Sequence, residues 1–190
     1  MHTVDLTFVI GGARSGKSAH AEQLAAASAL PVTYIATACG ADAEFAARIA
    51  HHRARRPAHW RLVEAGADLA AALREADGES HCVLIDCLTL WLATLLCPLG
   101  EPADAPDDKA ANAHLDAFEA ALAGACGKVI VVSNEIGLGV VPLGSATRRY
   151  VDELGRLNQR VAAVARDVTL MVAGLPVAVK CDGAVARAGR

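Results

Sequence analysis

The chain has 190 residues, of which 54% are hydrophobic and only 4% are aromatic, and its formal net charge is -3. This length is enough for one domain with a substantial core, and the apolar composition is typical of a globular α/β protein. A slightly negative chain without a long basic run is not expected to bind nucleic acid. The first residues carry no basic segment before an apolar run, so no secretory signal is expected.

The cysteines and the most apolar stretch indicate where in the cell the protein is expected. The six cysteines are scattered, form no C-x-x-C pair and lack the spacing of a zinc site, so we expect reduced thiols in a cytoplasmic protein. The stretch from Cys82 to Leu99 is the most membrane-like, but it contains Asp86. A buried strand followed by a buried helix is therefore expected there, rather than a membrane span.

A phosphate-binding motif follows the first predicted strand, Val4–Ile10. Residues 11–18 read G-x-x-x-x-G-K-S, and a predicted helix continues to about Ser28. Loop N–H groups and the positive end of the helix suit a phosphate, Lys17 can reach the β- and γ-phosphates, and the Ser18 hydroxyl can bind Mg²⁺. A plain glycine turn is the alternative. The expected nucleotide-binding residues of this loop are Gly11, Gly12, Ala13, Arg14, Ser15, Gly16, Lys17 and Ser18.

The rest of the chain alternates between strand-like and helix-like segments. Further strands are expected at Val32–Ala36, His59–Glu64, Cys82–Asp86 and Lys128–Val132. Helices are expected at Asp42–Arg53, Asp68–Ala76, Leu88–Leu96, Lys109–Cys126 (with Gly127 as its C-cap) and Ser145–Arg166. The acidic segment Pro98–Asp108 is expected to be a surface loop.

The end of the chain predicts a hairpin. Its two strand-like runs are Val168–Ala173 and Val177–Lys180, and Cys181–Arg190 is expected to be a frayed tail. The alternation predicts one nucleotide-binding domain over residues 1–180. Its fold class is α/β, a doubly wound and mostly parallel P-loop sheet with helices on both faces and a C-terminal antiparallel hairpin.

Two adjacent histidines lie on the predicted helix Asp42–Arg53. His51 falls on the same polar stripe as Arg48 and Arg55, whereas His52 falls on a neighbouring apolar stripe. Because adjacent helical residues point about 100° apart, the pair is poorly arranged to bind one metal ion. His51 is therefore the better candidate for a nucleophile or an acid–base group, and the arginines could bind a triphosphate. A solvated helix face is the alternative.

Polar residues also end two of the predicted strands. Asp86 could act on Mg²⁺ as a Walker B carboxylate, or it could be a helix N-cap. Asn134 and Glu135 follow another strand and could contact a ligand, or they could form a capping turn.

Several segments together resemble one enzyme family. These are residues 11–18, Tyr34-Ile35-Ala36-Thr37, Arg48-Ile49-Ala50-His51-His52, Arg56-Pro57-Ala58-His59-Trp60, the segment from Asn134 to Pro142, and Asn158-Gln159-Arg160. The chain is similar to the bifunctional adenosylcobinamide kinase / adenosylcobinamide-phosphate guanylyltransferase of cobalamin biosynthesis. The resemblance runs from about Leu6 to Lys180. The phosphate loop is generic, whereas the His-His-x-x-x-Arg-Pro and Asn-Glu-x-Gly-x-Gly segments are specific to the family.

The resemblance implies two reactions and a set of residues. A nucleoside triphosphate (ATP or GTP) would phosphorylate adenosylcobinamide, and GTP would then donate GMP, carried covalently on His51, to give adenosylcobinamide-GDP. It also implies a homotrimer, and it agrees with the Mg²⁺ expected from the phosphate loop. The further nucleotide-binding residues that it implies are Thr37, Ala38, Cys39, Ala54, Arg55, Arg56, Pro57, Glu64 and Asp86.

One position departs from the resemblance. A family member has glutamate where this chain has Asp86, which keeps the charge but shortens its reach. Asp86 could bind Mg²⁺ with Ser18, or its carboxylate could accept hydrogen bonds from guanine. Two other functions stay open from the sequence: a single-activity small-molecule P-loop kinase, and a nucleotide-switched binding protein.

Overall fold

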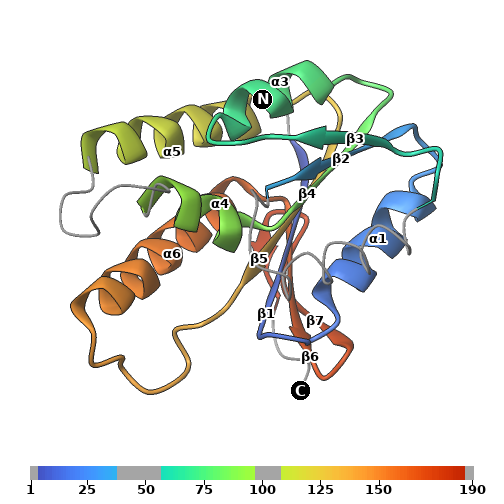
Figure 1. The fold of residues 1–190 in the computed structure, drawn as a ribbon. Helices are drawn as coiled ribbons and strands as arrows, with labels where there is room; N and C mark the ends of the chain where they lie inside the picture. The colour runs from blue at the N-terminus through green and yellow to red at the C-terminus, as the bar shows by residue number, and fades with distance from the viewer. Residues whose placement is uncertain (1–3, 38–56, 97–107, 187–190) are drawn as a thin grey trace.

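The computed structural model describes residues 4–37, 57–96 and 108–186. The strands are β1 (Asp5–Gly11), β2 (Val32–Ala36), β3 (Arg61–Glu64), β4 (Cys82–Asp86), β5 (Lys128–Asn134), β6 (Asp167–Val172), β7 (Leu175–Cys181) and β8 (Ala184–Val185). The helices are α1 (Lys17–Ala27), α3 (Leu69–Ala76), α4 (Leu88–Leu96), α5 (Asp108–Ala123) and α6 (Ser145–Val164). Figure 1 shows their arrangement.

The strands form one sheet in the order β3-β2-β4-β5-β1-β6-β7-β8. In this spatial order, the six strands β3, β2, β4, β5, β1 and β6 run parallel to one another. The strand β7 pairs antiparallel with β6 and with β8. This topology confirms the predicted α/β fold with a C-terminal antiparallel hairpin. Within the described ranges, no helix is both long enough and apolar enough to cross a membrane.

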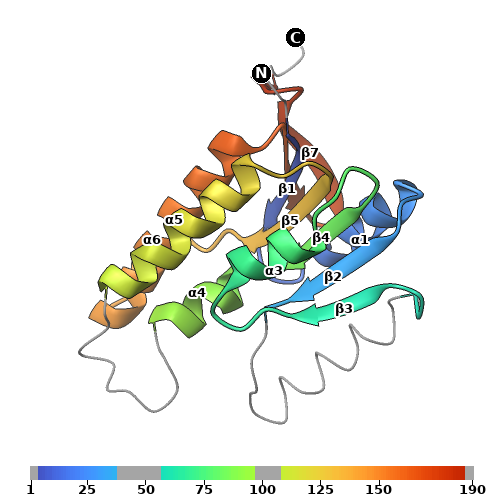
Figure 2. The same ribbon diagram turned by 90° about the horizontal axis from the view of Figure 1, so that it is seen from above.

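Helices cover both faces of the sheet, as Figure 2 shows: α1 lies on one side, and α3, α4, α5 and α6 lie on the other. Alternate residues of each strand serve the two cores, because successive side chains of a strand point to opposite faces. In β4, for example, Val83 and Ile85 join the large core under α3–α6, whereas Cys82 and Leu84 join the smaller core under α1. The helices therefore bury both faces of the central strands, whereas β3 and β7 at the sides of the sheet are largely exposed.

The parallel register brings the ends of five strands to one edge. Gly11 pairs with Asn134, and Ala36 lies between Asp86 and Glu64 in neighbouring strands. Parallel strands expose their carboxyl ends at the same side of the sheet, where α/β proteins bind their ligands. The phosphate loop leaves β1 at that edge.

The structure corrects the predicted end of α5 and its predicted cap. The helix expected to end at Cys126 ends at Ala123, and Gly127 is not its C-cap. Instead the Asp77 carboxylate accepts hydrogen bonds from the N–H groups of Cys126 (2.8 Å) and Gly127 (2.9 Å). A Cβ on Gly127 would lie only 2.2 Å from the Gly78 carbonyl oxygen, so glycine is needed there for a close approach of two backbones.

The predicted frayed tail is wrong at its start. Cys181 completes β7, and Ala184–Val185 form β8, which pairs with β7. Asp108, expected at the end of a surface loop, begins α5. The predicted helix Asp42–Arg53 and the loop before Asp108 lie outside the described residues.

Candidate functional site at the carboxyl edge of the sheet

The phosphate loop runs from the end of β1 into α1. Gly16 occupies the N-cap with φ +91°, a conformation that favours glycine, and it precedes Lys17, which is buried. The Lys17 Nζ donates a hydrogen bond of 2.8 Å to the Gly12 carbonyl oxygen across the loop. The loop is therefore closed around its own ammonium group, at the positive end of a helix.

The turn between β6 and β7 supports this loop. The Gly174 N–H donates to the Ser15 carbonyl oxygen (3.0 Å), and a Cβ on Gly16 would lie 3.3 Å from the Gly174 Cα. A Cβ on Gly11 would lie 2.6 Å from the Met171 carbonyl oxygen. The C-terminal hairpin thus restricts which residues fit in the phosphate loop. Sequence reasoning missed Met171 and Gly174, because neither belongs to a motif.

Asp86 at the end of β4 lies beside the start of α1. Its Oδ1 accepts a hydrogen bond of 3.4 Å from the Ser18 hydroxyl, and its Oδ2 accepts one of 2.9 Å from the Tyr34 hydroxyl. Tyr34 lies in β2 and is almost fully buried, so its hydrogen bond holds the Asp86 carboxylate in a fixed position. A serine hydroxyl beside a carboxylate offers the oxygen ligands that Mg²⁺ prefers. The role of Tyr34 was missed, although it belongs to a segment shared with the family.

Thr37 ties β2 to the chain after β4. Its hydroxyl donates to the Cys87 carbonyl oxygen (2.7 Å) and accepts from the Cys87 N–H (2.9 Å). The Thr37 side chain is fully buried, so its hydroxyl is used within the protein. Burial and then the neighbouring Asp86 carboxylate raise the pKa of the Cys87 thiol. Cys87 is therefore a neutral structural thiol.

Thiol reactivity should separate the cysteines by exposure. Cys126 and Cys181 are exposed free thiols, whereas burial raises the pKa of both Cys82 and Cys87. Only the thiolate attacks alkylating reagents, so the exposed pair should react first at pH 8. We expect at least a tenfold difference in the rate of iodoacetamide labelling, followed by peptide mass spectrometry of the native protein. Equal rates would contradict the described packing around Cys82 and Cys87.

Other predicted nucleotide-binding residues are only partly described. Glu64 ends β3 with an exposed side chain, and Pro57 is exposed where the described chain resumes. Because Glu64 pairs with Ala36 and Ala36 pairs with Asp86, both carboxylates lie at the same edge. The remaining candidates lie outside the described residues: Ala38, Cys39, His51, Ala54, Arg55 and Arg56.

A polar network joins the end of β5 to α4 and α6. The Asn134 side chain donates to the Thr89 hydroxyl (2.9 Å), and the Asn158 side chain donates to the Asn134 carbonyl oxygen (3.0 Å). The Glu135 N–H donates to the Gly11 carbonyl oxygen (3.0 Å). The segment after β5 is therefore fixed directly beside the phosphate loop. Sequence reasoning named Asn134 and Glu135 but missed Thr89, which has no motif to mark it.

The site contains no dense cluster of metal ligands among the described residues. No group of three or more histidine, cysteine, aspartate and glutamate side chains is gathered there. A cation at this edge would depend on Ser18, Asp86 and the phosphate oxygens of a nucleotide, which is how Mg²⁺ is commonly held in P-loop proteins.

Comparison with solved structures supports the α/β fold. A prototypical ATPase from the type III secretion system of pathogenic bacteria aligns with a TM-score of 0.51 at 11% identity, covering 92% of this chain and 56% of that chain. At this identity the likeness concerns the fold alone.

Sequence comparison gives the family. A family model described as cobinamide kinase / cobinamide phosphate guanyltransferase matches residues 7–179. The bifunctional adenosylcobalamin biosynthesis protein CobP of Pseudomonas aeruginosa is 51% identical over 90% of this chain and 95% of its own length. The corresponding protein CobU of Escherichia coli K12 is 41% identical, over 92% of this chain and 99% of its own length. The chain therefore belongs to the cobinamide kinase / cobinamide phosphate guanyltransferase family of bifunctional enzymes in adenosylcobalamin biosynthesis.

Proposed function

We propose that this enzyme phosphorylates adenosylcobinamide with a nucleoside triphosphate and then transfers GMP from GTP to the new phosphate through a covalent GMP–His51 intermediate. The observation that carries the proposal is the phosphate loop with its adjoining Ser18–Asp86 pair at the carboxyl edge of the sheet. The family match and the family-specific segment around His51 add the two reactions and the acceptor.

The loop would bind the phosphates of the nucleotide. Lys17 now donates to the Gly12 carbonyl oxygen, so a β- or γ-phosphate oxygen could replace that acceptor without leaving the buried ammonium unpaired. The backbone N–H groups from Gly12 to Ser18 and the start of α1 would supply the other donors. The Lys17 ammonium and these N–H groups would stabilise the negative charge that develops when a phosphoryl group is transferred.

Ser18 and Asp86 would hold Mg²⁺ with the nucleotide phosphates, and the bound cation would neutralise their negative charge. Tyr34 keeps the carboxylate in place, because its hydroxyl already donates to Asp86. Because both carboxylate oxygens accept hydrogen bonds within the protein, we propose that Asp86 serves the metal site and that Glu64 reads guanine. The exposed Glu64 carboxylate could accept from the guanine N1–H and exocyclic amine.

The remaining nucleotide contacts would come from the chain on either side of the predicted histidine helix. These proposed contacts are Thr37 through its backbone, Ala38, Cys39, Ala54, Arg55, Arg56 and Pro57. The arginines would stabilise phosphate charge.

The guanylyl transfer would proceed in two balanced steps. First, a neutral ring nitrogen of His51 attacks the α-phosphorus of GTP, and the bond from that phosphorus to the bridging oxygen breaks, so pyrophosphate leaves with the electron pair. Second, a phosphate oxygen of the phosphorylated acceptor attacks the same phosphorus, and the phosphorus–nitrogen bond breaks to restore His51.

The enzyme would act as a homotrimer in the cytoplasm, where its nucleotide substrates are made.

Neutralising each carboxylate separately should distinguish their roles. We expect Asp86→Asn to raise the Mg²⁺ concentration needed for half-maximal rate by at least about tenfold, for ATP and GTP alike. Glu64→Gln should leave the Mg²⁺ dependence unchanged and lower the preference for GTP over ITP, which lacks the exocyclic amine. Initial rates across a Mg²⁺ series measure both effects. A change in guanine preference in Asp86→Asn alone would reverse the two roles.

Product analysis tests the proposed function itself. Purified enzyme, Mg²⁺, GTP and adenosylcobinamide are incubated, and the corrinoid products are separated and weighed by mass spectrometry. The proposal predicts adenosylcobinamide phosphate first and adenosylcobinamide-GDP later, with release of pyrophosphate. Accumulation of the phosphate alone, with GTP in excess, would show a kinase without guanylyl transfer.

A further inference from the structure

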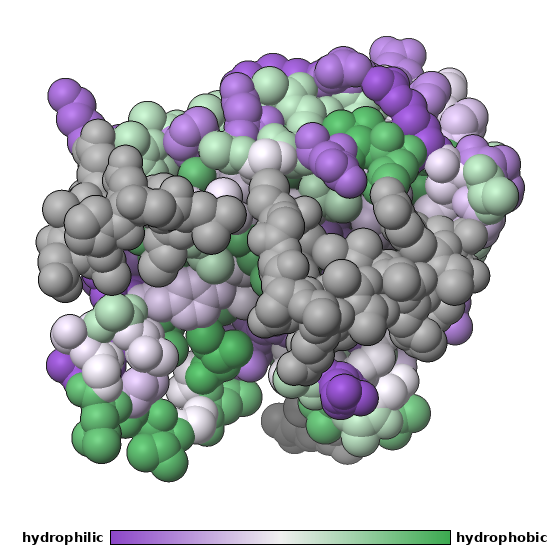
Figure 3. Space-filling view, viewed as in Figure 1, coloured by the Kyte–Doolittle hydropathy of each residue, from purple (hydrophilic) through white to green (hydrophobic). Residues whose placement is uncertain are grey.

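An apolar surface follows β5 directly. The segment from Ile136 to Leu143 carries large aliphatic side chains, and Leu138, Val140 and Leu143 are 86%, 96% and 97% exposed. Figure 3 shows a hydrophobic patch at the lower left, where Figure 1 places the loop between β5 and α6. So many aliphatic side chains in contact with water within one short segment mark a surface that binds a ligand or a partner.

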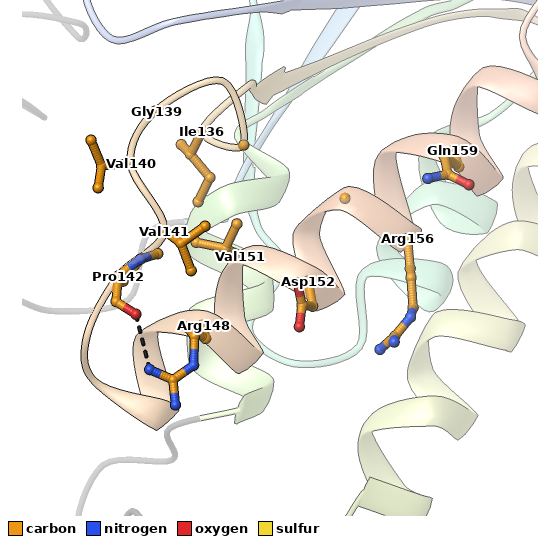
Figure 4. Close-up of a pocket in the computed structure, with 12 residues that line it drawn as sticks. Ile136, Gly139, Val140, Val141, Pro142, Arg148, Val151, Asp152, Arg156 and Gln159 are labelled. Carbon is orange, nitrogen blue, oxygen red and sulfur yellow. Dashed lines mark hydrogen bonds between the residues drawn. The ribbon is translucent and has the colours of Figure 1, made fainter.

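A groove of about 660 Å³ lies between this loop and α6. The loop contributes Ile136, Val141 and Pro142, and the helix contributes Val151, Asp152, Arg156 and Gln159. Figure 4 shows Ile136, Val141 and Val151 gathered at one end, with Asp152, Arg156 and Gln159 farther along the helix. The groove thus combines an aliphatic wall with a row of exposed polar groups.

Hydrogen bonds hold the aliphatic wall in position. The Arg148 guanidinium donates to the Pro142 carbonyl oxygen (3.0 Å) and also to the carbonyl oxygen of Leu143, which ties the loop to α6. At the other end, the Gly137 N–H donates to the Glu135 carboxylate (2.7 Å). The exposed side chains therefore sit on a loop that is bonded at both ends.

Gly155 gives the groove its depth. It lies inside the 20-residue helix α6, where glycine is less favourable than alanine by about 1 kcal/mol. A Cβ built on Gly155 meets nothing within 4 Å, so no neighbouring chain explains the missing side chain. Because Gly155 lines the groove, its absent side chain leaves space for a bound molecule.

We propose that this groove holds the corrin ring of the cobinamide acceptor, an inference that rests on the proposed function. A corrin ring presents methyl groups and flat apolar faces, and its rim carries primary amides. The aliphatic loop fits the ring, and the carboxylate, guanidinium and amide groups of Asp152, Arg156 and Gln159 can hydrogen-bond to the amides. A groove of this size suits part of a large ligand whose remainder reaches outward.

The position of the groove fits an acceptor for the phosphate loop. The groove begins one residue after Glu135, whose N–H donates to the carbonyl oxygen of Gly11, the first residue of the loop. A ring seated there could extend its hydroxyl-bearing arm toward the γ-phosphate of a bound nucleotide. Continuity with the nucleotide site favours the acceptor over a second copy of the chain as the occupant.

A side chain added at Gly155 tests the proposal. We would measure equilibrium binding of cobinamide, without nucleotide, by dialysis and visible absorbance for wild type, Gly155→Phe and Ala163→Phe. Ala163 is exposed on the same helix and does not line the groove, so it controls for an added phenyl ring on α6. Binding of a fluorescent GTP analogue and the thermal midpoint check that each protein is folded. We expect Gly155→Phe to raise the Kd for cobinamide at least tenfold, and Ala163→Phe to change it less than twofold.

The outcomes separate this proposal from the one on which it rests. An unchanged cobinamide Kd in a folded Gly155→Phe protein would overturn the groove assignment while leaving the proposed reactions intact. Sedimentation of the same proteins examines the other occupant: if Gly155→Phe alters self-association and leaves cobinamide binding unchanged, the groove joins copies of the chain. Failure of the wild type to phosphorylate cobinamide in product analysis would instead reject the proposed function. If Gly155→Phe does not fold, Gln159→Ala replaces it, with a smaller expected rise in Kd of about threefold, and no rise would overturn the proposal.

Discussion

Lys17→Met should lower the rates of phosphorylation and of guanylyl transfer by about 10³-fold each, because one buried cation serves the phosphates in both reactions. The side chain is buried within the loop, and its Nζ is held at 2.8 Å from the Gly12 carbonyl oxygen. Methionine fills similar space without the charge. Initial-rate assays with GTP and adenosylcobinamide, and separately with adenosylcobinamide phosphate, measure the two losses.

A second lysine provides the control for Lys17. Lys128 is the first residue of β5, so it lies at the amino ends of the parallel strands, away from the phosphate loop. It forms an ion pair with Asp5 at 3.3 Å. Lys128→Met should keep both reactions within twofold of wild type, and the loss of a partly exposed ion pair should cost at most about 1 kcal/mol of stability. A Lys17→Met protein that is folded and retains more than a tenth of either rate would contradict the proposed phosphate contact.

His51→Ala should separate the two reactions. Without the proposed nucleophile, transfer of GMP to adenosylcobinamide phosphate should fall by at least about 10³-fold. Phosphorylation of adenosylcobinamide needs no covalent carrier, so its rate should stay within about fivefold of wild type if the replacement only removes the nucleophile. The measurement is the time course of both corrinoid products with GTP as the only nucleotide.

The neighbouring histidine is the matched control. The sequence pattern places His51 on a polar stripe and His52 on an apolar one, so His52→Ala removes the same chemistry one residue away. We expect His52→Ala to retain guanylyl transfer, with any loss explained by lower stability in a thermal melt. A loss of transfer in the His52 variant, with full transfer in the His51 variant, would assign the nucleophile to the other histidine.

Local sequence patterns predicted the framework of the fold well. The bounds of β2, β4 and α4 agree with the predicted segments residue for residue. The strands β2 and β4 are buried runs of apolar residues rich in β-branched types, and turn residues precede each of them. The phosphate loop was predicted because strand, glycines, lysine and serine occur at fixed spacing, and the family segments extended that prediction to the two reactions.

Long-range contacts account for what the sequence did not predict. Tyr34 reaches Asp86 across 52 residues, and Gly174 contacts Ser15 from the opposite end of the chain. The predicted C-cap at Gly127 was wrong, because Asp77 takes up the backbone N–H groups there. Such partners become neighbours only through the strand order, which the sequence pattern does not specify. The groove beside α6 was missed for the same reason, although several of its residues belong to the recognised segment from Asn134 to Pro142.

Trapping the guanylylated protein is the most direct test of the two-reaction account. Enzyme and Mg²⁺ are incubated with GTP labelled at the α-phosphate, or at the γ-phosphate, and then denatured, for wild type beside His51→Ala. The account predicts α-label on the wild-type protein that is lost in acid, no γ-label, and no label on the variant. Wild-type protein that carries no α-label, while making only phosphorylated cobinamide, would contradict the covalent intermediate and leave a single-activity kinase.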